Sequence, residues 1–563
     1  MNKKFKTMVQ YYSFKHSSFL MYMCFLVFSV LSIYFVLFAN ASILGGHDSI
    51  FHIYRIEGLV LALQQGDFFP RINYFFLEGS GYASSVFYSD LFLYPVALFR
   101  LLGLSIPLSY AIYISLINFA TFVIGYKSFD SLANNKKKSF FFAVCYGLSS
   151  YRLSDVILRS AIGEILAFMV LPIAFVGLIH VVLGDTKKYY WLIVGMTLLF
   201  YSHMITTFIF CLFIVFLLVV NSKRLFKERN RLKYLFFSAV LTVLLVANNL
   251  FPMLEQIFFQ PLKFATNPVY SLQDGAWSIG EYIWNAVINN GFSNIGILVL
   301  ISIFILLVKV KNLSILNKQL LGLSMLFLVL SVKEFPQFLL EQTIFNMVQF
   351  PWRYFIMVTI CISWILADVV FSFTSKFKIL NRNIPILLLF FLIVSSVHFQ
   401  IKNRLDDERA RMYSYSDYVK EVDKYRSIWL GAGSEYLPSS AEVKNMTTAI
   451  ADSKDTTISN YKREYNSISF DYSRANNTKV VVPFIYYKGY VGEVIGTDKK
   501  LLVSESPYFD GYCEVTVTGS GSVKVQYKWT LIQKISFAIT GVTLVAFSIS
   551  MYRNRKGYFM KKL

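Results

Sequence analysis

The chain has 563 residues, of which 56% are hydrophobic and only 15% are charged. This composition indicates a membrane protein with many spans and excludes an ordinary soluble globular domain. The formal net charge is +21, but blocks of Lys and Arg stand between apolar runs, which is the pattern of the positive-inside rule and requires no nucleic-acid partner.

The N-terminal region predicts a membrane anchor. The apolar run Phe19–Ala39 is long enough to cross the hydrocarbon layer, and it follows a segment, Met1–Ser18, that carries several lysines. Because the run exceeds the short core of a secretory signal, we expect an uncleaved helix with its N-terminus in the cytoplasm.

The next region, residues 40–107, has mixed polarity and is predicted to form a large extracytoplasmic loop. Its run Ser85–Leu102 is apolar, but it contains Asp90, Pro95 and Arg100. We therefore interpret this run as a re-entrant or interfacial segment rather than a span.

Eleven further apolar runs are predicted to span the membrane, which gives about twelve helices with both termini in the cytoplasm. They are Leu108–Tyr126, Phe140–Tyr151, Glu164–Leu183, Trp191–Phe200, Ile205–Val220, Tyr234–Phe251, Gly291–Val308, Leu320–Val332, Arg353–Phe371, Ile384–His398 and Leu531–Met551. The connections assigned to the cytoplasm are rich in Lys and Arg, and only Asp130, Asp185 and Glu228 oppose these charges.

A hydrophilic stretch, Phe399–Thr530, separates the last two predicted spans and is expected to be an extracytoplasmic domain. Its first part, Asp406–Leu430, has a helix-like charge pattern, whereas Lys479–Trp529 contains short strand signals that suggest a β-sandwich. The predicted organisation is a membrane domain over 1–398, this domain over 399–530, and a final helix with a basic tail over 531–563. The fold class is an α-helical polytopic membrane protein with a small extracytoplasmic, mixed but β-rich domain.

One stretch of the first outer loop carries three chemically active side chains. If the chain is helical from Ser49 onward, Asp48, His52 and Arg55 lie at i, i+4 and i+7 on one face. An acid, an imidazole and a guanidinium then converge, as an active site requires. The alternative is a helix N-terminus that Asp48 or Ser49 caps, with solvated charges.

Other charged side chains occur where predicted helices emerge on the outer side. They include Arg159 and Asp155 before a span, Glu164 at its start, His203 in a tight turn, and Arg353 after Pro351-Trp352. Taken singly, each is interpretable as a solvated charge or an interfacial anchor. No Walker loop, dinucleotide fingerprint or Gly-x-Ser-x-Gly elbow occurs, which argues against nucleotide-driven transport and serine hydrolysis.

These motifs in this order resemble the bacterial multi-spanning membrane glycosyltransferases of the GT-C superfamily. The resemblance is to the family that modifies lipoteichoic acid and to the 6-pyruvoyl-tetrahydropterin-synthase-related membrane proteins. It covers most of the chain and rests on Gly46-His47-Asp48 with His52 and Arg55, Arg159–Glu164, Ser202-His203, and Gln349–Arg353. A late outer domain followed by a final helix also fits the resemblance.

The resemblance implies transfer of a sugar from a polyprenyl-phosphate carrier to an extracytoplasmic cell-envelope polymer or glycolipid. Arg159 and Arg353 are the expected phosphate ligands, since guanidinium groups stabilise a leaving phosphate. Asp48 is the expected general base. Supporting roles in binding fall to Glu164, His52 and His203, and Arg55 either binds phosphate or pairs with Asp48.

Metal dependence stays open at this point, because Asp48, His52 and Glu164 are also compatible with a divalent metal ion. A transporter or flippase of lipid-linked saccharide is the main alternative function, although the predicted spans contain few ionisable residues away from their ends. A non-catalytic protein of envelope assembly is a third. All three place the protein in the cell membrane, with its functional face outside.

Overall fold

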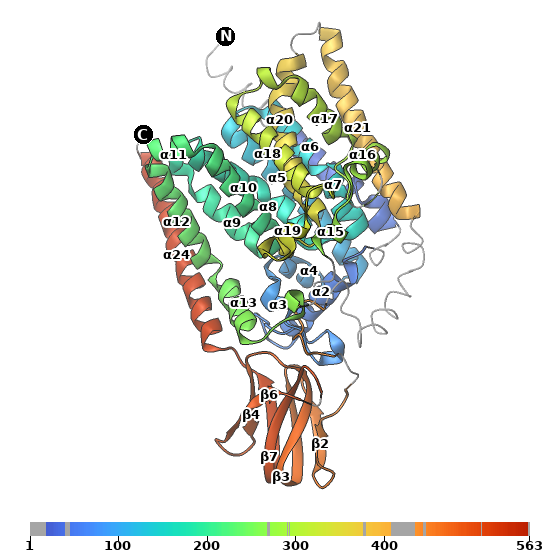
Figure 1. Cartoon of the computed structure of the whole chain (residues 1–563), viewed down its shortest axis with the longest axis vertical. Helices are drawn as coiled ribbons and strands as arrows, with labels where there is room; N and C mark the ends of the chain where they lie inside the picture. Colours follow the sequence, from blue (N-terminus) through green and yellow to red (C-terminus); the bar gives the residue numbers. More distant parts are fainter. Residues whose placement is uncertain are drawn as a thin grey trace. The chain divides into compact units, whose positions relative to one another are not determined.

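The computed structural model describes residues 18–39, 46–266, 271–289, 291, 293–374, 379–406, 434–442, 446–507 and 509–560. The chain is mostly helical and carries a separate antiparallel sheet (Figure 1). It forms two compact units, and neither is continuous in sequence. The first unit comprises 1–49, 103–238 and 270–416, and the second comprises 50–102, 239–269 and 417–563.

Helices make up the first unit. After a helix over Ser18–Leu31 and the π-helix η1 (Tyr34–Ala39) come α5 (Ile106–Ala133), α6 (Lys136–Gly147), α7 (Ser150–Leu153), the π-helix η4 (Ser154–Arg159), α8 (Ile162–Val182), η5 (Thr186–Lys188), α9 (Tyr190–Ser202), α10 (Met204–Val220) and α11 (Ser222–Lys227). Later come α15 (Leu272–Gly275), α16 (Ile279–Ile288), α17 (Ile297–Val308), η6 (Val310–Asn312), α18 (Ile315–Ser331), α19 (Phe338–Glu341), η7 (Ile344–Val348), η8 (Pro351–Tyr354), α20 (Phe355–Thr374) and α21 (Ile379–Asp406).

Each of the apolar runs predicted to span a membrane overlaps a helix. Among the described residues, four helical stretches are long and apolar enough to cross a membrane: Ile106–Ala133, Ile162–Val182, Pro351–Phe371 and Leu531–Arg553. A fifth candidate is the pair α12 (Asn230–Leu245) and α13 (Ala247–Phe259), which is bent by 73°. The chain therefore has four candidate spans, or five with the bent pair, and the expected total of about twelve stays a prediction.

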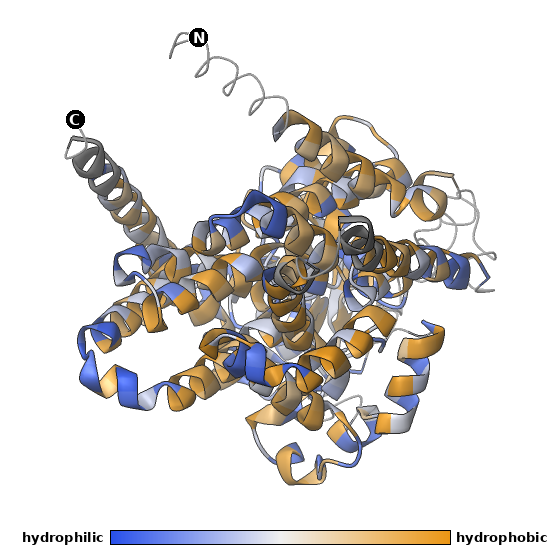
Figure 2. Cartoon of the chain, turned by 90° about the horizontal axis from the view of Figure 1, so that it is seen from above, coloured by the Kyte–Doolittle hydropathy of each residue, from blue (hydrophilic) through white to orange (hydrophobic). Residues whose placement is uncertain are grey.

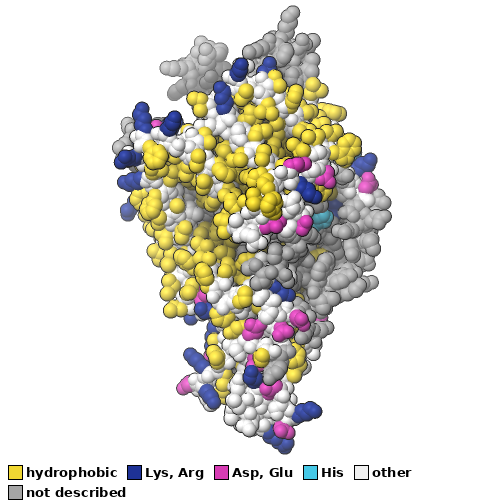
Figure 3. Space-filling model, viewed as in Figure 1, with side chains coloured by type: hydrophobic (Ala, Val, Ile, Leu, Met, Phe, Trp, Pro, Cys, Tyr) yellow, Lys and Arg dark blue, Asp and Glu magenta, His cyan; other side chains and the backbone are white. Residues whose placement is uncertain are grey.

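The apolar character of these helices extends to their exposed faces. Hydrophobic residues dominate the helices in Figure 2, and apolar side chains cover much of the helical part of the face in Figure 3. Phe236 on α12, Phe304 on α17 and Val542 on α24 (Leu531–Met560) are among the exposed large apolar residues. Exposed apolar surface of this extent is typical of helices that face lipid, so several helices are suited to membrane insertion.

The core of the first unit is built around α8, and 94% of the apolar window of this helix is buried. Two glycines allow α8 and α9 to pack closely. A Cβ atom on Gly177 would lie 2.2 Å from Leu192 N, and one on Gly195 would lie 2.3 Å from Ala174 N. Small residues at such crossings let helix backbones approach each other, and the N-terminus of α8 is thereby held in a fixed place.

The second unit contains residues 50–102, and its helices there are α2 (Ser49–Gln64), η2 (Leu77–Gly79), α3 (Ser84–Phe87), η3 (Leu91–Leu93) and α4 (Tyr94–Leu101). It also contains α13, α14 (Lys263–Thr266) and α24. The run Ser85–Leu102 is thus divided among short helices instead of forming one span, in agreement with the prediction. Its interfacial placement stays a prediction.

A single hydrogen-bonded sheet of antiparallel strands completes the second unit, with the order β1-β3-β7-β4-β5. Two long strands, β3 and β7, pair along most of their length. In addition, β2 pairs with β3, and β6 pairs with β7. The strands are β1 (Ile450–Ala451), β2 (Thr457–Arg463), β3 (Ser467–Ile485), β4 (Tyr490–Val494), β5 (Lys500–Leu501), β6 (Val503–Glu505) and β7 (Tyr512–Tyr527). The sequence suggested a sandwich of short strands, whereas the long strands join all of them in one sheet.

Two features of the second unit bear on the predicted domain boundaries. Apart from Asp406, which ends α21, the helix-like segment Asp406–Leu430 lies outside the described residues. Segment 50–102 packs against the sheet: Tyr74 Oη lies 3.3 Å from Tyr490 Oη, and the Tyr74 ring contacts Phe484. This compact unit therefore combines segments that the sequence assigns to separate domains.

Candidate functional site

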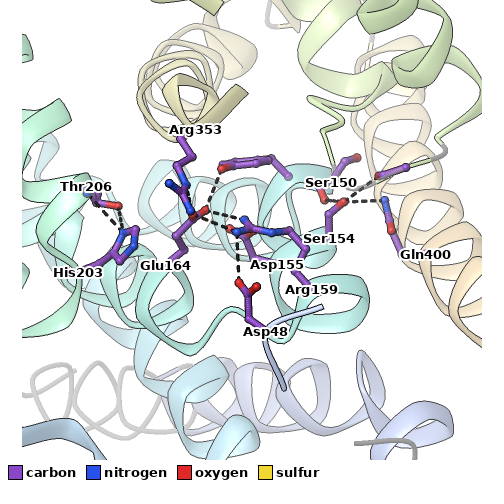
Figure 4. A network of polar contacts seen from close by, with 12 residues as sticks. Asp48, Ser150, Ser154, Asp155, Arg159, Glu164, His203, Thr206, Arg353 and Gln400 are labelled. Carbon is purple, nitrogen blue, oxygen red and sulfur yellow. Dashed lines mark hydrogen bonds and ion pairs between the residues drawn. The ribbon is translucent and has the colours of Figure 1, made fainter. Parts of the chain in front are cut away.

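Arg159 stands at the centre of a buried polar network in the first unit (Figure 4). Its Nη1 donates to Asp155 Oδ1 at 2.6 Å and to Glu164 Oε2 at 2.9 Å. Its Nη2 contacts Glu164 Oε1 at 3.3 Å and Asp48 Oδ2 at 3.4 Å. One guanidinium thus joins three acids, two of them close in sequence and the third from the segment before α2.

The local backbone explains why Arg159 and Glu164 meet. The π-helix η4 ends at Arg159, and Ser160 then adopts a left-handed conformation with φ of 56°. Ala161 N closes the turn on Asp155 O at 3.0 Å, and α8 begins at Ile162. Glu164 therefore lies in the first turn of α8, where the positive end of the helix dipole favours a carboxylate.

Glu164 also binds groups from two other elements. Tyr151 Oη donates to Glu164 Oε2 at 2.9 Å, and Arg353 Nε donates to Glu164 Oε1 at 3.0 Å. Arg353 is held in turn by Val348 O and Gln349 Oε1, both at 2.8 Å from its Nη1. Both oxygens of this buried carboxylate are occupied, so Glu164 acts as the junction of the network.

The Trp352 ring makes cation–π contacts with both Arg159 and Arg353. The Arg159 Cζ atom lies 4.5 Å from the centroid of the Trp352 ring, and the Arg353 Cζ atom lies 5.8 Å from it. The tryptophan side chain is itself buried. A cation over an indole face is stabilised by the ring quadrupole, and more strongly where water is excluded.

Asp48 differs from the other acids of the network. Its side chain is 25% exposed, whereas those of Glu164 and Asp155 are 3% and 0% exposed. Its single ion pair is the 3.4 Å contact with Arg159, and among the described residues Asp48 Oδ1 has no hydrogen-bond partner. Asp48 is thus the acid of this network best placed to reach a reactant.

A close backbone contact fixes the position of Asp48. Its main-chain N–H donates to Arg159 O at 2.9 Å. A Cβ atom on Gly46 would lie 2.2 Å from Ser160 Oγ, so a residue without a side chain is needed at that position. The segment before α2 is therefore placed by backbone contacts with the turn that carries Arg159.

His203 lies beside this network, at the start of α10. Its Nδ1 lies 2.8 Å from Thr206 Oγ1 and accepts from Thr206 N at 3.4 Å, so His203 caps the helix. Burial lowers the pKa of His203 to about 3, and the nearby arginines oppose its protonation further, although Glu164 favours it. His203 is therefore neutral at ordinary pH.

The charges of the network nearly cancel. Burial raises the pKa of Asp155 well above its ordinary value, and repulsion from Glu164 adds to this effect, although Arg159 opposes it. Arg159 and Arg353 both contact the Glu164 carboxylate, and Arg159 also contacts that of Asp48. The raised pKa of Asp155 reduces the negative charge of the network, which favours the binding of an anion.

Two predicted site residues, His52 and Arg55, belong to a separate cluster in the second unit. Arg55 Nη2 donates to Tyr88 O, Ser89 O and Asp90 Oδ1 at 2.7 to 3.0 Å, and the Arg55 Cζ atom lies 4.1 Å from the centroid of the Tyr88 ring. The expected pairing of Arg55 with Asp48 is therefore corrected, because Arg55 pairs with Asp90. His52 Nδ1 lies 3.4 Å from Arg55 Nη1.

The metal set suggested by the sequence, Asp48, His52 and Glu164, is not supported by the geometry. Asp48 and Glu164 share Arg159, and both Glu164 oxygens already accept hydrogen bonds. In the part of the chain that the structure describes, no three or more His, Cys, Asp or Glu side chains form a group suited to a metal ion.

The structure adds three residues that the sequence had not assigned to the site: Tyr151, Asp155 and Trp352. Spacing gave a signal for two of them, because Tyr151, Asp155 and Arg159 follow one another at intervals of four along a helical segment. No comparable signal identified Trp352 beyond its place before Arg353.

No protein-family model matches the chain, and no curated protein matches it. The geometry of the site and the resemblance of its motifs are therefore the basis for proposing a function.

Proposed function

We propose that the protein is a membrane glycosyltransferase of the GT-C type. It transfers a sugar from a polyprenyl-phosphate donor to a cell-envelope polymer, such as a teichoic acid, or to a glycolipid. In this proposal about twelve helices cross the membrane, both termini are cytoplasmic, and the network around Arg159 faces the outer side. Long apolar helices support it, because the isoprenoid tail of the donor needs protein surface within the bilayer.

One observation carries the proposal: the contrast between Glu164 and Asp48. Glu164 is buried and fully bonded, which suits a residue that organises its neighbours. The Asp48 carboxylate is partly exposed, makes one ion pair of 3.4 Å among the described residues, and keeps one oxygen without a hydrogen-bond partner there. A loosely held carboxylate beside Arg159, whose partner Glu164 also binds Arg353, suits a general base next to a phosphate site.

The reaction balances with these groups. The acceptor hydroxyl oxygen attacks the anomeric carbon of the sugar, and Asp48 takes the hydroxyl proton. The bond between the anomeric carbon and the phosphate oxygen breaks, and its electron pair leaves with the polyprenyl phosphate. Arginine side chains stabilise the negative charge that develops on this leaving group.

Arg353 is the better phosphate ligand of the two arginines. Its Nη2 has no hydrogen-bond partner among the described residues, whereas both Nη atoms of Arg159 are bonded. Arg159 then contributes charge and orientation. Asp48, Arg159 and Arg353 carry the reaction in this proposal, and Glu164 and His203 support them.

A transporter or flippase of lipid-linked saccharide is the second candidate, and one observation favours it. Arg152 is buried and binds Asn118 Oδ1 at 2.6 Å and Thr121 Oγ1 at 3.2 Å, both on the candidate span α5. No ion pair joins it to an acid among the described residues. Ionisable groups inside a helical bundle often line a substrate path.

Reconstitution separates these functions. Wild-type protein and the variant Asp48→Asn are placed in vesicles with a set of polyprenyl-phosphate sugars and an envelope polymer on the outside. The expected result is a new glycosidic bond with the wild type and almost none with the variant, while the control variant Asp455→Asn, at an exposed acid, behaves as wild type.

Other outcomes decide against the proposal. Equal transfer by wild type and Asp48→Asn contradicts the role of Asp48 as base. Movement of intact donor between leaflets without a new bond identifies a transporter. Binding of the polymer with neither transfer nor movement supports a non-catalytic assembly protein.

A further inference from the structure

The helical segment Ser150–Arg159, which comprises α7 and η4, has two polar faces. Tyr151, Asp155 and Arg159 point into the charged network described above. Ser150 and Ser154 lie on a different face and contact α21 (Figure 4). This segment therefore stands between the candidate site and a second, uncharged cluster.

The contacts of this neutral cluster are short and buried. Ser150 Oγ lies 2.6 Å from Ser396 Oγ, and Gln400 Nε2 donates to Ser154 Oγ at 3.1 Å. Ser154 Oγ in turn donates to Ser150 O at 3.0 Å. Gln400 and Ser154 are both 0% exposed, so solvent does not compete for these hydrogen bonds.

The loop after α16 closes the cluster. Asn289, in a left-handed conformation with φ of 50°, donates through Nδ2 to Ser396 O at 3.0 Å. Asn403 Nδ2 donates to Asn289 O at 3.1 Å. Gly296 permits the packing, because a Cβ atom there would lie 2.0 Å from Ser150 Oγ. Helix α21 and the loop after α16 thus both pack against one face of the segment Ser150–Arg159.

Because η4 is a π-helix, these contacts at its first residue affect the position of its last residue. A π-helix is rare, usually short, and common at functional sites. Ser154 is the first residue of η4 and Arg159 is the last, so a change of register at Ser154 displaces the guanidinium at the other end. The pairing of Arg159 with Glu164 and Asp48 depends on that register, because each contact has a narrow range of distance and angle.

We propose that Gln400 and Ser396 on α21 are positioning residues that hold η4 in the register in which Arg159 meets Glu164 and Asp48. This inference rests on the proposed function, in which the Arg159 network binds the donor phosphate. Neither residue touches the charged side chains. They act through Ser150 and Ser154.

A double-mutant cycle tests the coupling in the reconstituted full-length protein. Gln400→Met removes the amide but keeps the length of the side chain, and Ser154→Ala removes its partner. Each variant is expected to raise the donor KM about fivefold, the effect of one neutral hydrogen bond, with the acceptor KM unchanged. The double variant should add little to either single change, because both remove the same contact.

Asn317→Leu is the matched control. Asn317 on α18 is also buried and donates to a side chain, Asp368 Oδ2 at 2.8 Å, which lies on α20 and not on α21 or η4. The donor KM should stay at the wild-type value in this variant. An unchanged donor KM in Gln400→Met, or an equal rise in Asn317→Leu, overturns the proposal, because general destabilisation would lower only the active fraction.

A ¹⁹F NMR measurement that does not depend on sugar transfer tests the positioning role separately from the proposed function. The chain contains 7 Trp residues, and 5-fluorotryptophan labelling places a ¹⁹F probe at Trp352, beneath Arg159. Its resonance is assigned by loss of the signal in Trp352→Phe. It should move in Gln400→Met and stay fixed in Asn317→Leu, even if the wild type transfers no sugar. A fixed resonance in Gln400→Met overturns the positioning role.

Discussion

Glu164 Oε1 accepts a hydrogen bond of 3.0 Å from Arg353 Nε, although 189 residues separate the two in sequence. The same carboxylate binds Arg159 and Tyr151. Glu164 is therefore the point at which α7, η4, α8 and η8 meet. Its removal should disturb stability, whereas removal of Asp48 should disturb chemistry.

Glu164→Gln should lower the free energy of unfolding by roughly 3–5 kcal/mol, because the buried Arg159 and the partly buried Arg353 lose their shared counter-charge. Thermal unfolding in detergent measures the change. Tyr151→Phe is the control, since it removes one hydrogen bond to the same carboxylate and should cost only about 1 kcal/mol. Similar losses in both variants would contradict the junction role of Glu164.

Asp48→Asn should reduce kcat for sugar transfer by roughly 10²- to 10⁴-fold, the usual contribution of a general base, with little change in donor binding. The amide keeps the shape of the side chain and the partly exposed position. Steady-state transfer assays and a separate donor-binding measurement check the two parts. A fall in donor affinity with kcat intact would instead make Asp48 a binding residue.

Arg353→Lys should raise the donor KM by roughly tenfold, because lysine lacks the planar fork that holds Val348 O, Gln349 and Glu164 while offering Nη2 to a phosphate. The exposed residue Arg474 supplies the control, Arg474→Lys, which should leave the donor KM unchanged. Kinetics with varied donor concentration give both values. If the donor KM stays constant in Arg353→Lys, another group binds the phosphate.

Gly46→Ala should reduce transfer, because the new methyl group collides with Ser160 Oγ and displaces the segment that carries Asp48. Ser160→Gly removes the colliding side chain and suits a residue with φ of 56°. The double variant should therefore recover part of the lost activity. Failure of Gly46→Ala to affect transfer would show that the position of Asp48 tolerates this displacement.

Stability should depend on pH through His203. Its pKa is lowered by burial to about 3, compared with 6.5 in the unfolded chain. The contribution of His203 to the free energy of unfolding is therefore complete above pH 6.5. It is lost as the pH falls from 6.5 towards 3, because the unfolded chain binds a proton that the folded chain does not. Melting temperatures over this range measure the loss.

His203→Asn is the control for that pH dependence, since asparagine also caps helices but does not titrate. Its melting temperature should fall less steeply than that of the wild type between pH 6.5 and 4. Parallel curves for the two proteins would assign the acid sensitivity to other groups.

The sequence predicted the helical runs well, because apolar segments of sufficient length have few other stable conformations. Each predicted span overlaps a helix, and strand signals in the late hydrophilic region belong to a real sheet. These are local properties, and neighbouring residues are enough to determine them.

Only the tertiary structure decided which charges meet. Asp48, His52 and Arg55 share a helical spacing, yet Asp48 contacts Arg159 while Arg55 pairs with Asp90. The close approach at Gly46 and the arrival of Arg353 at Glu164 each depend on segments far apart in the chain. Hydrogen bonds and ion pairs act over a few ångströms, so the fold that brings their atoms together determines the site.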